Sequence, residues 1–310
     1  MDAHTDFEAI DAESERMIDE LTFPLPPPPV YHYTDTNGLR GIFENKALWA
    51  TNYRFLNDAS EMVYARELFE EVALNLEATQ SDERAKLFLE ACRNLDHQLK
   101  NQIDAYLVCF CDKPDLLNQW RDYCSTGGGY YVKFHGPDVF YALNEFQPNV
   151  ARGMGLKVCY DREDQWKYFE YAIRSHLDHW MKYGVENTQS ADPKFSLNFY
   201  KEQLSFKMSW ASLAFKHPAF ELENEWRFCA LKPAGHIQGI KFRTGAYGLT
   251  PYLVCPLTNP PTNTLMPIEE IGVGPCSDAD SAKLAVNLLL AIHNYASIPV
   301  VCSKIPVRHH

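Results

Sequence analysis

Three glutamates recur at every second position in a short aromatic-rich segment. Residues 219–230 read Ala-Phe-Glu-Leu-Glu-Asn-Glu-Trp-Arg-Phe-Cys-Ala, which places Glu221, Glu223 and Glu225 two residues apart. This period is typical of a β-strand, in which alternate side chains share a face. Carboxylates held together raise one another's pKa and suit catalysis, a metal ion or a cationic partner. A solvated strand face, with Arg227 pairing a neighbour, explains the same pattern.

Two further pairs have spacings that occur in metal sites. Cys109 and Cys111 would share a face of a strand, and His176 and His179 would share a face of a helix. Neither pair is followed by the second pair or carboxylate motif that a zinc site needs. We therefore predict no bound metal, and we expect the two histidines to have a surface or core role.

Composition and charge restrict the class of protein. The chain has 310 residues, 46% of them hydrophobic, and a formal net charge of -12. An acidic protein of this kind lacks the broad positive surface that nucleic acid or an anionic membrane attracts, although a local basic groove remains compatible with it. Nine scattered cysteines favour reduced thiols, and neither a signal peptide nor a membrane span is recognisable. These features predict a cytoplasmic protein that does not bind membranes.

The elements that must position the glutamates alternate along the chain. Strands are predicted at 30–34, 48–51, 103–111 and 130–134, and helices at 37–45 and 115–123. Asn57 and Asp58 precede a helical pattern and are expected to cap it. Three glycines at 127–129 lead into a strand, where they permit a tight turn or the close approach of a ligand. Their spacing matches neither a dinucleotide fingerprint nor a phosphate loop.

The domain organisation is predicted from the composition and from the order of these elements. Residues 1–29 are acidic, contain a loose amphipathic helix and end in a proline run, which predicts an N-terminal arm. Residues 30–310 intermingle strands and helices and are predicted to form a single α+β domain. Its last part, with strands at 268–273 and 298–303 around a helix at 277–296, reads as a βαβ-like unit.

Four short motifs together resemble a known family. They are Tyr31-His32-Tyr33-Thr34, Phe55-Leu56-Asn57-Asp58 with Glu61, Trp120-x-x-Tyr123, and Phe220 to Arg227. In this order they look like a large, little-characterised bacterial family that is often found near phage-defence genes. The resemblance covers nearly the whole chain from Val30 onward and implies a role in antiviral defence.

A more distant resemblance suggests chemistry. A strand-borne His32, a small helix, a Leu-x-Ala-Thr strand and a late Glu223-x-Glu225 are similar to ADP-ribosyltransferases. The resemblance implies a split β core surrounded by helices, NAD as co-substrate, and Glu225 and Glu223 as catalytic residues. The middle element lacks a Ser-Thr-Ser signature, and His32 replaces the arginine usual beside Glu-x-Glu. The match therefore mixes two subclasses, and the type of acceptor does not carry across.

The resemblance also assigns residues to NAD. His32 would contact the adenosine-side ribose, and Tyr33 or Tyr123 would stack on nicotinamide, near the element that carries Trp120. Arg40 or Arg54 would meet the diphosphate, and Thr34 is a further NAD-binding candidate. A carboxylate at Glu225 would stabilise the oxocarbenium-like transition state. Core positions explain several of the same residues: His32 as a histidine bonded to backbone, and Trp120 and Tyr123 as packed aromatics.

Three hypotheses follow for function. The first is an NAD-consuming transferase or NAD hydrolase that acts as an intracellular toxin or defence effector on a protein or nucleic-acid acceptor, with a neutralising or regulatory partner protein. The second is a non-catalytic ligand-binding or sensing module. The third is a nuclease that holds Mg²⁺ with Glu221, Glu223, Glu225 and Asp58.

Overall fold

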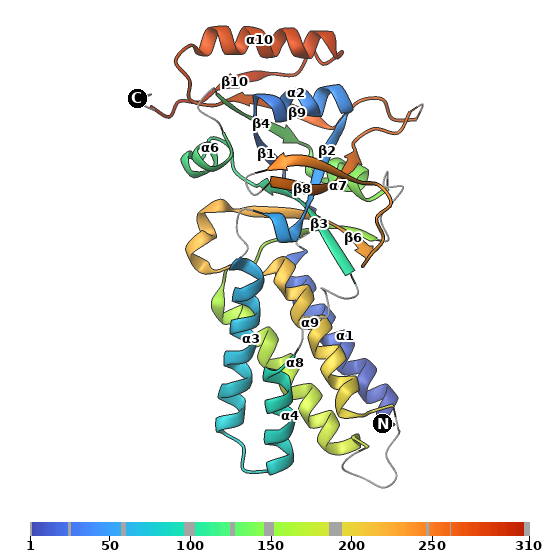
Figure 1. Ribbon diagram of the computed structural model, residues 1–310. Coiled ribbons are helices and arrows are strands. Elements are labelled where there is room, and N and C mark those ends of the chain that lie inside the picture. Colours follow the sequence, from blue (N-terminus) through green and yellow to red (C-terminus); the bar gives the residue numbers. More distant parts are fainter. Residues whose placement is uncertain are drawn as a thin grey trace. The chain divides into compact units, whose positions relative to one another are not determined.

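The computed structural model describes residues 2–23, 26–56, 60–95, 103–124, 128–145, 152–185, 194–245, 248–260 and 262–306. Asn57, Asp58 and Gly127 lie outside these ranges, as does the side chain of Glu61. The chain forms two compact units (Figure 1). The helical unit combines Met1–Pro24, Asn57–Asp104 and Lys157–Glu221, and the sheet unit combines Leu25–Leu56, Ala105–Leu156 and Leu222–His310.

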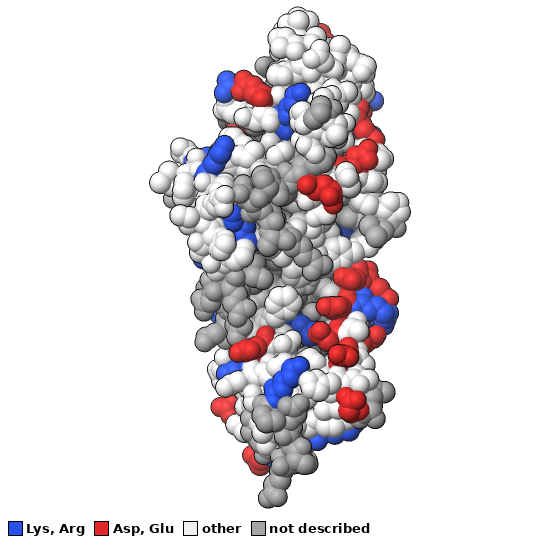
Figure 2. All heavy atoms as spheres, turned by 90° about the vertical axis from the view of Figure 1, so that its right-hand side faces the viewer, with Lys and Arg blue, Asp and Glu red and all other residues white. Residues whose placement is uncertain are grey.

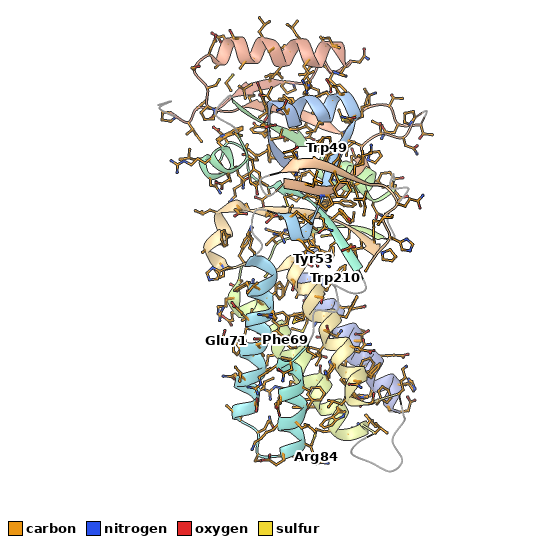
Figure 3. All side chains as sticks on the ribbon, viewed as in Figure 1. Trp49, Tyr53, Phe69, Glu71, Arg84 and Trp210 are labelled. Atoms are coloured by element: carbon orange, nitrogen blue, oxygen red, sulfur yellow. The ribbon has the colours of Figure 1, made fainter. Side chains whose placement is uncertain are left out.

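The helical unit is built from long helices that pack on one another. They are α1 (Ala3–Thr22), α3 (Ser60–Ala78), α4 (Glu83–Arg93), α8 (Arg162–Tyr183) and α9 (Leu197–Ala214). Phe69 of α3 is fully buried against Phe169 of α8, whereas Glu71 lies on the outer side of α3 and binds Arg162; Figure 3 labels Phe69 and Glu71. The helix predicted within residues 1–22 is present as α1 and packs on α8. The predicted division at residue 29 stays a prediction.

The sheet unit contains the strands and the shorter helices. The strands are β1 (Val30–Asp35), β2 (Ala47–Asn52), β3 (Ile103–Cys111), β4 (Gly129–Phe134), β5 (Arg152–Lys157), β6 (Glu225–Pro233), β7 (Ile240–Gly245), β8 (Gly248–Pro256), β9 (Ile268–Val273) and β10 (Val300–Cys302). The helices are α2 (Thr36–Asn45), α6 (Leu117–Tyr123), α7 (Gly136–Glu145) and α10 (Ala279–Ile292), with the short 3-10 turn η1 (Tyr53–Phe55). A second 3-10 turn, η2 (Pro218–Glu223), begins in the helical unit and ends in the sheet unit. The α+β class predicted from the sequence is confirmed.

The strands form one mixed sheet in the order β10-β9-β4-β1-β3-β2-β8-β7, and β6 joins β3 to β5. β10 runs parallel to β9 with α10 between them in the chain, which confirms the βαβ-like C-terminal unit. β1 is antiparallel to β4 over its full length but meets β3 at one position, where Tyr31 faces Cys111. The sheet therefore opens between β1 and β3 beyond this pair.

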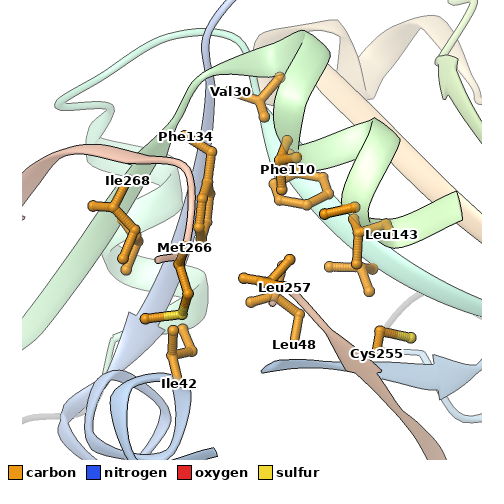
Figure 4. Close-up of a cluster of buried hydrophobic side chains, with 14 of the residues drawn as sticks. Val30, Ile42, Leu48, Phe110, Phe134, Leu143, Cys255, Leu257, Met266 and Ile268 are labelled. Carbon is orange, nitrogen blue, oxygen red and sulfur yellow. The ribbon is translucent and has the colours of Figure 1, made fainter. Parts of the chain in front are cut away.

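Burial separates the two faces of the central strands. One face carries a large apolar core to which β1 and β3 contribute Val30 and Phe110 (Figure 4). β6 contributes Phe228 to the same core. The other carries a smaller cluster of Tyr31, Tyr33, Cys111, Trp120 and Tyr131. Because successive side chains of a strand point to opposite faces, His32 and Tyr33 leave β1 on different sides.

Candidate functional site around the end of β3

The glutamate segment is not a continuous strand. Pro218–Glu223 forms the 3-10 turn η2, Asn224 has a left-handed φ of 47°, and β6 begins at Glu225. The prediction that Glu221, Glu223 and Glu225 line up on one strand face is therefore wrong. Alternation in the sequence did not reveal the break, because asparagine tolerates the left-handed conformation that ends the turn. The backbone N–H of Asp112, just after β3, donates to the Asn224 carbonyl at 3.0 Å and anchors this break.

Glu225 is held by an arginine two residues further along β6. Arg227 Nε donates to Glu225 Oε1 and Arg227 Nη2 donates to Glu225 Oε2, both at 2.8 Å. Both side chains are buried, on the face of β6 opposite Trp226 and Phe228. The pairing of Arg227 with a neighbour is therefore present, but the pair is buried and does not lie on the solvated strand face that this alternative expected. Such a bidentate pair fixes the orientation of the carboxylate.

Cys111 shows that this pair lies beside the end of β3. Burial raises the pKa of the Cys111 thiol to about 12, and the nearby charges of Asp112 and Glu225 add to the effect. The Lys113 N–H donates to the Cys111 sulfur at 3.4 Å. Glu225 and the last residues of β3 are therefore neighbours.

His32 also contacts the end of β3, at the opening of the sheet. Its Nδ1 lies 2.9 Å from the Cys109 carbonyl. A carbonyl only accepts, so Nδ1 carries the proton and Nε2 keeps a lone pair. Burial lowers the pKa of His32, the Cys109 carbonyl partly offsets this, and the Arg243 charge lowers it further. His32 is a neutral acceptor at pH 7, and its backbone bond agrees with the core alternative.

Tyr33 and Trp120 belong to the aromatic cluster on the other face. Their rings meet edge to face with centroids 4.8 Å apart, and Trp120 stacks on Tyr131. The Tyr33 hydroxyl donates to the Lys113 carbonyl at 3.1 Å and accepts from the Leu116 N–H at 3.2 Å. Burial raises the pKa of Tyr33 well above its ordinary value. Both side chains are packed and tie β1 and α6 to the turn that follows β3.

A hollow of about 400 Å³ lies beside this turn. We call it the β3-end groove; its lining is Lys113, Leu116, Leu117, Asn118, Arg121, Leu222 and Asn224. Asn118 and Asn224 both donate to the Leu222 carbonyl, at 3.2 and 3.0 Å, and Gln119 donates to the Glu223 carbonyl at 3.5 Å. These bonds attach the end of η2 to α6. The groove thus combines two cations, two amides and three leucines.

The remaining predicted residues lie elsewhere in the sheet unit. Arg40 is on the exposed side of α2, where its Nε lies 3.6 Å from Glu44. Arg54 donates to the Tyr53 hydroxyl at 2.9 Å and covers the Tyr53 ring. Tyr123, the last residue of α6, is 39% exposed, and Thr34 is half-buried in β1 opposite Tyr130. The structure places none of these four among the groove-lining residues.

Sequence reasoning missed the cations that do lie near the predicted residues. Arg243 of β7 affects His32 and donates to the Thr51 hydroxyl at 3.0 Å. Lys113 and Arg121 flank the groove. The signal for Arg243 was the alternation of Lys241 and Arg243 in a short strand. Lys113 and Arg121 had no comparable signal, because a turn and a short helix bring them together.

The histidine pair whose spacing occurs in metal sites has defined surroundings. Among the described residues, no group of three His, Cys, Asp or Glu side chains is placed to hold a metal ion. His179 Nε2 bonds the Ala3 carbonyl at 2.9 Å, and its Nδ1 accepts from the Tyr200 hydroxyl at 2.6 Å. His176 is completely buried beside Phe7 and Tyr200. Of the surface and core roles expected for the two histidines, the structure shows the core role.

One family model matches part of the chain. It is described as a protein of unknown function, DUF2971, and it covers residues 119–228, from α6 to β6. This stretch contains Trp120, Tyr123, Glu223 and Glu225, so it includes two of the motifs on which the resemblance to an uncharacterised family rested. No curated protein and no solved structure matches the chain. Within the described residues, no helix is long and apolar enough to cross a membrane.

Proposed function

We propose that the sheet unit binds NAD in the β3-end groove and acts as an ADP-ribosyltransferase-like enzyme. One observation carries this proposal. Leu222 and Asn224, which line the groove with Lys113 and Arg121, alternate in the chain with Glu223 and Glu225. The backbone segment that carries Glu223 and Glu225 thus borders the same hollow as two cations.

The chemistry of the lining suits a dinucleotide. Lys113 and Arg121 can each bind a diphosphate oxygen, and an arginine can do so with two parallel hydrogen bonds. Leu116, Leu117 and Leu222 offer apolar surface to a ring, and the amide groups can meet ribose hydroxyls. The volume of about 400 Å³ falls within the range of small-molecule sites.

The proposed reaction breaks the bond between nicotinamide and ribose. Its transition state resembles an oxocarbenium ion, which a nearby carboxylate stabilises. Glu225 would supply this carboxylate, in the orientation that Arg227 gives it, and Glu223 would orient or deprotonate the acceptor. A protein or nucleic acid would be the acceptor, or water in an NAD hydrolase, and a toxin or defence effector of this kind would need a neutralising partner.

A second candidate is a binding module that senses NAD or a related nucleotide without cleaving it. The observation that favours it is the Glu225–Arg227 pair, because both carboxylate oxygens already accept hydrogen bonds from the arginine. For catalysis at Glu225, at least one of these two hydrogen bonds must break when the ligand binds. A binding module needs no such change.

Two measurements on purified protein separate the candidates. The first is nicotinamide release from NAD, with and without cell lysate as a source of acceptor, for wild type, Glu225→Gln and Glu223→Gln. Glu221→Gln is the matched control, because Glu221 is an exposed glutamate in the same 3-10 turn as Glu223. The second is calorimetric binding of NAD and ADP-ribose to Lys113→Gln and Arg121→Gln, with Lys283→Gln on the exposed side of α10 as control.

Each outcome is informative. A transferase or hydrolase releases nicotinamide, loses at least a hundredfold in rate with Glu225→Gln and keeps its rate with Glu221→Gln. Binding without release, weakened about tenfold by either groove variant, supports the sensor instead. If NAD and ADP-ribose do not bind at millimolar concentration, or if the groove variants bind as wild type does, the groove is not their site and both candidates fail.

A further inference from the structure

A second surface of the sheet unit has the features of a binding site and lies on β2, β8 and β7, the last three strands of the sheet order. Thr51 of β2 and Lys241 of β7 both pair with Tyr252 of β8, and Arg243 pairs with Thr250. Directly paired residues of antiparallel strands point to the same face. The Trp49 face, as we call it, consists of Trp49, Thr51, Lys241, Arg243, Thr250 and Tyr252.

The aromatic part of the Trp49 face is a stacked pair. The rings of Trp49 and Tyr252 are 4.5 Å apart between centroids and inclined by 28°. Tyr252 is buried beneath, whereas Trp49 keeps 39% of its surface exposed; Figure 3 labels Trp49 on β2. Tyr252 thus supports an indole ring that remains accessible. A half-exposed tryptophan on a rigid strand can stack on a flat ligand.

The charged part of the Trp49 face is basic. Lys241 and Arg243 are both exposed, and Arg243 is steadied by its hydrogen bond to Thr51. None of the residues of β2, β7 and β8 is Asp or Glu, although the chain has a net charge of -12. Figure 2 shows acidic and basic side chains interspersed on one face of the molecule. These three strands therefore differ from the chain as a whole in carrying positive charge without carboxylates.

We propose that the Trp49 face binds single-stranded nucleic acid. Proteins that bind such strands without sequence preference stack bases on exposed aromatic side chains and hold the backbone with cations. Lys241 and Arg243 are two residues apart on β7, a separation of about 7 Å along a strand. Two positions at this spacing can meet neighbouring phosphate groups while a base stacks on Trp49. The proposal goes beyond NAD binding in the β3-end groove and does not depend on it.

The geometry favours a strand over a free nucleotide. Mononucleotide sites are concave and enclose most of the ligand. The Trp49 face is instead a row of side chains across three strands, with its cations and aromatic ring in the open. A ligand that crosses several such positions gains from each contact. The two phosphate contacts release counterions, so the affinity should fall as salt rises, while salt also screens the long-range repulsion from the acidic remainder of the chain.

The test is fluorescence anisotropy of labelled 20-nucleotide oligo-dT and oligo-rU with the full-length protein, at several salt concentrations from 20 to 200 mM. The variants are Trp49→Ala, Trp49→Phe and Lys241→Gln with Arg243→Gln. Phe242→Ala is the matched control, because Phe242 is a 61% exposed aromatic on the same strand that points to the opposite face. Circular dichroism and thermal melts check that each variant folds.

We expect saturable binding at low salt. Trp49→Ala should weaken it about tenfold, Trp49→Phe should retain most of it, and Phe242→Ala should leave it unchanged. The double glutamine variant should reduce the slope of log affinity against log salt by roughly 1.4, about 0.7 for each lost phosphate contact. Absence of binding at 20 mM salt overturns the proposal. So does equal weakening by Phe242→Ala and Trp49→Ala, or uridine monophosphate binding as tightly as oligo-rU.

Discussion

Arg227 donates two parallel hydrogen bonds of 2.8 Å to Glu225, its neighbour on the same face of β6, and both side chains are almost completely buried. The pair stands where the chain changes from the 3-10 turn η2 to the strand β6. Two buried charges lose their hydration, and their mutual hydrogen bonds compensate for this loss only while both partners are present. The pair is therefore both the centre of the proposed chemistry and a structural element.

Removal of one partner of this pair should destabilise the protein. Arg227→Met removes both of these hydrogen bonds and the compensating charge from the buried Glu225 carboxylate, and we expect the free energy of unfolding to fall by roughly 3 to 5 kcal/mol. Urea unfolding followed by circular dichroism measures this. Glu225→Met combined with Arg227→Met should recover most of the loss, because no charge then remains buried. Equal losses in the single and double variants would contradict this account.

His32 should be sensitive to the loss of its Nδ1 donor. His32→Phe removes the hydrogen bond that Nδ1 donates to the Cys109 carbonyl at the opening between β1 and β3, which should cost roughly 0.5 to 1.5 kcal/mol of stability. His32→Gln carries an amide donor and should lose less. Thermal unfolding of the three proteins provides the comparison, and a phenylalanine variant as stable as wild type would show that the hydrogen bond contributes nothing.

Two glycines of the sheet unit should respond to alanine in opposite directions. A Cβ on Gly272 would lie 2.2 Å from the Tyr131 ring, whose hydroxyl donates to Glu270 at 2.6 Å. A Cβ on Gly41, inside α2, meets nothing within 4 Å. We expect Gly272→Ala to lower the melting temperature by several degrees, and Gly41→Ala to stabilise by about 0.5 to 1 kcal/mol through helix propensity. A melting temperature of Gly272→Ala at or above that of Gly41→Ala would contradict the packing described here.

The sequence predicted elements well where one local pattern decided the structure. The strands with β-branched and aromatic runs, such as 30–34 and 103–111, and the C-terminal βαβ-like unit are all present. It failed between Ala219 and Asn224, where alternation at a period of two was compatible with both a strand and a 3-10 turn. The single left-handed Asn224 decides between them, and its conformation depends on the Asp112 contact across the fold.

The candidate site could be predicted from the sequence only as far as local patterns determine it. Strand alternation places His32 and Tyr33 on opposite faces of β1, a consequence of adjacency that the resemblance to a family did not take into account. The cations of the β3-end groove come from the turn after β3 and from α6, so their proximity arises from tertiary structure. Residue type indicated the chemistry, but only the packing of α6 on the end of η2 showed where the chemistry could occur.

Acid should destabilise the helical unit through His176. Burial lowers the pKa of this histidine from 6.5 to about 3, the Lys207 charge and His179 add to the effect, and the Ala172 carbonyl and Asp11 oppose it. Lys207 itself binds Asp11 of α1 at 2.5 Å. Among the described residues, neither ring nitrogen of His176 has a partner at the distance and angle of a hydrogen bond. The imidazole is therefore neutral in the folded protein and has little to offset the loss of its hydration.

Since the folded pKa lies below the unfolded one, the unfolded chain takes up the proton first as the pH falls. Stability is fully present above pH 6.5 and declines between 6.5 and about 3, by up to roughly 1.4 kcal/mol per pH unit. His176→Phe keeps a planar ring beside Phe7 and Tyr200 without buried nitrogens. Urea unfolding at pH 7, 6 and 5 should show a flatter decline for this variant than for wild type, while His236→Gln, a change at an exposed turn, should leave the decline unchanged. Equal slopes in all three proteins would mean that other groups control the acid response.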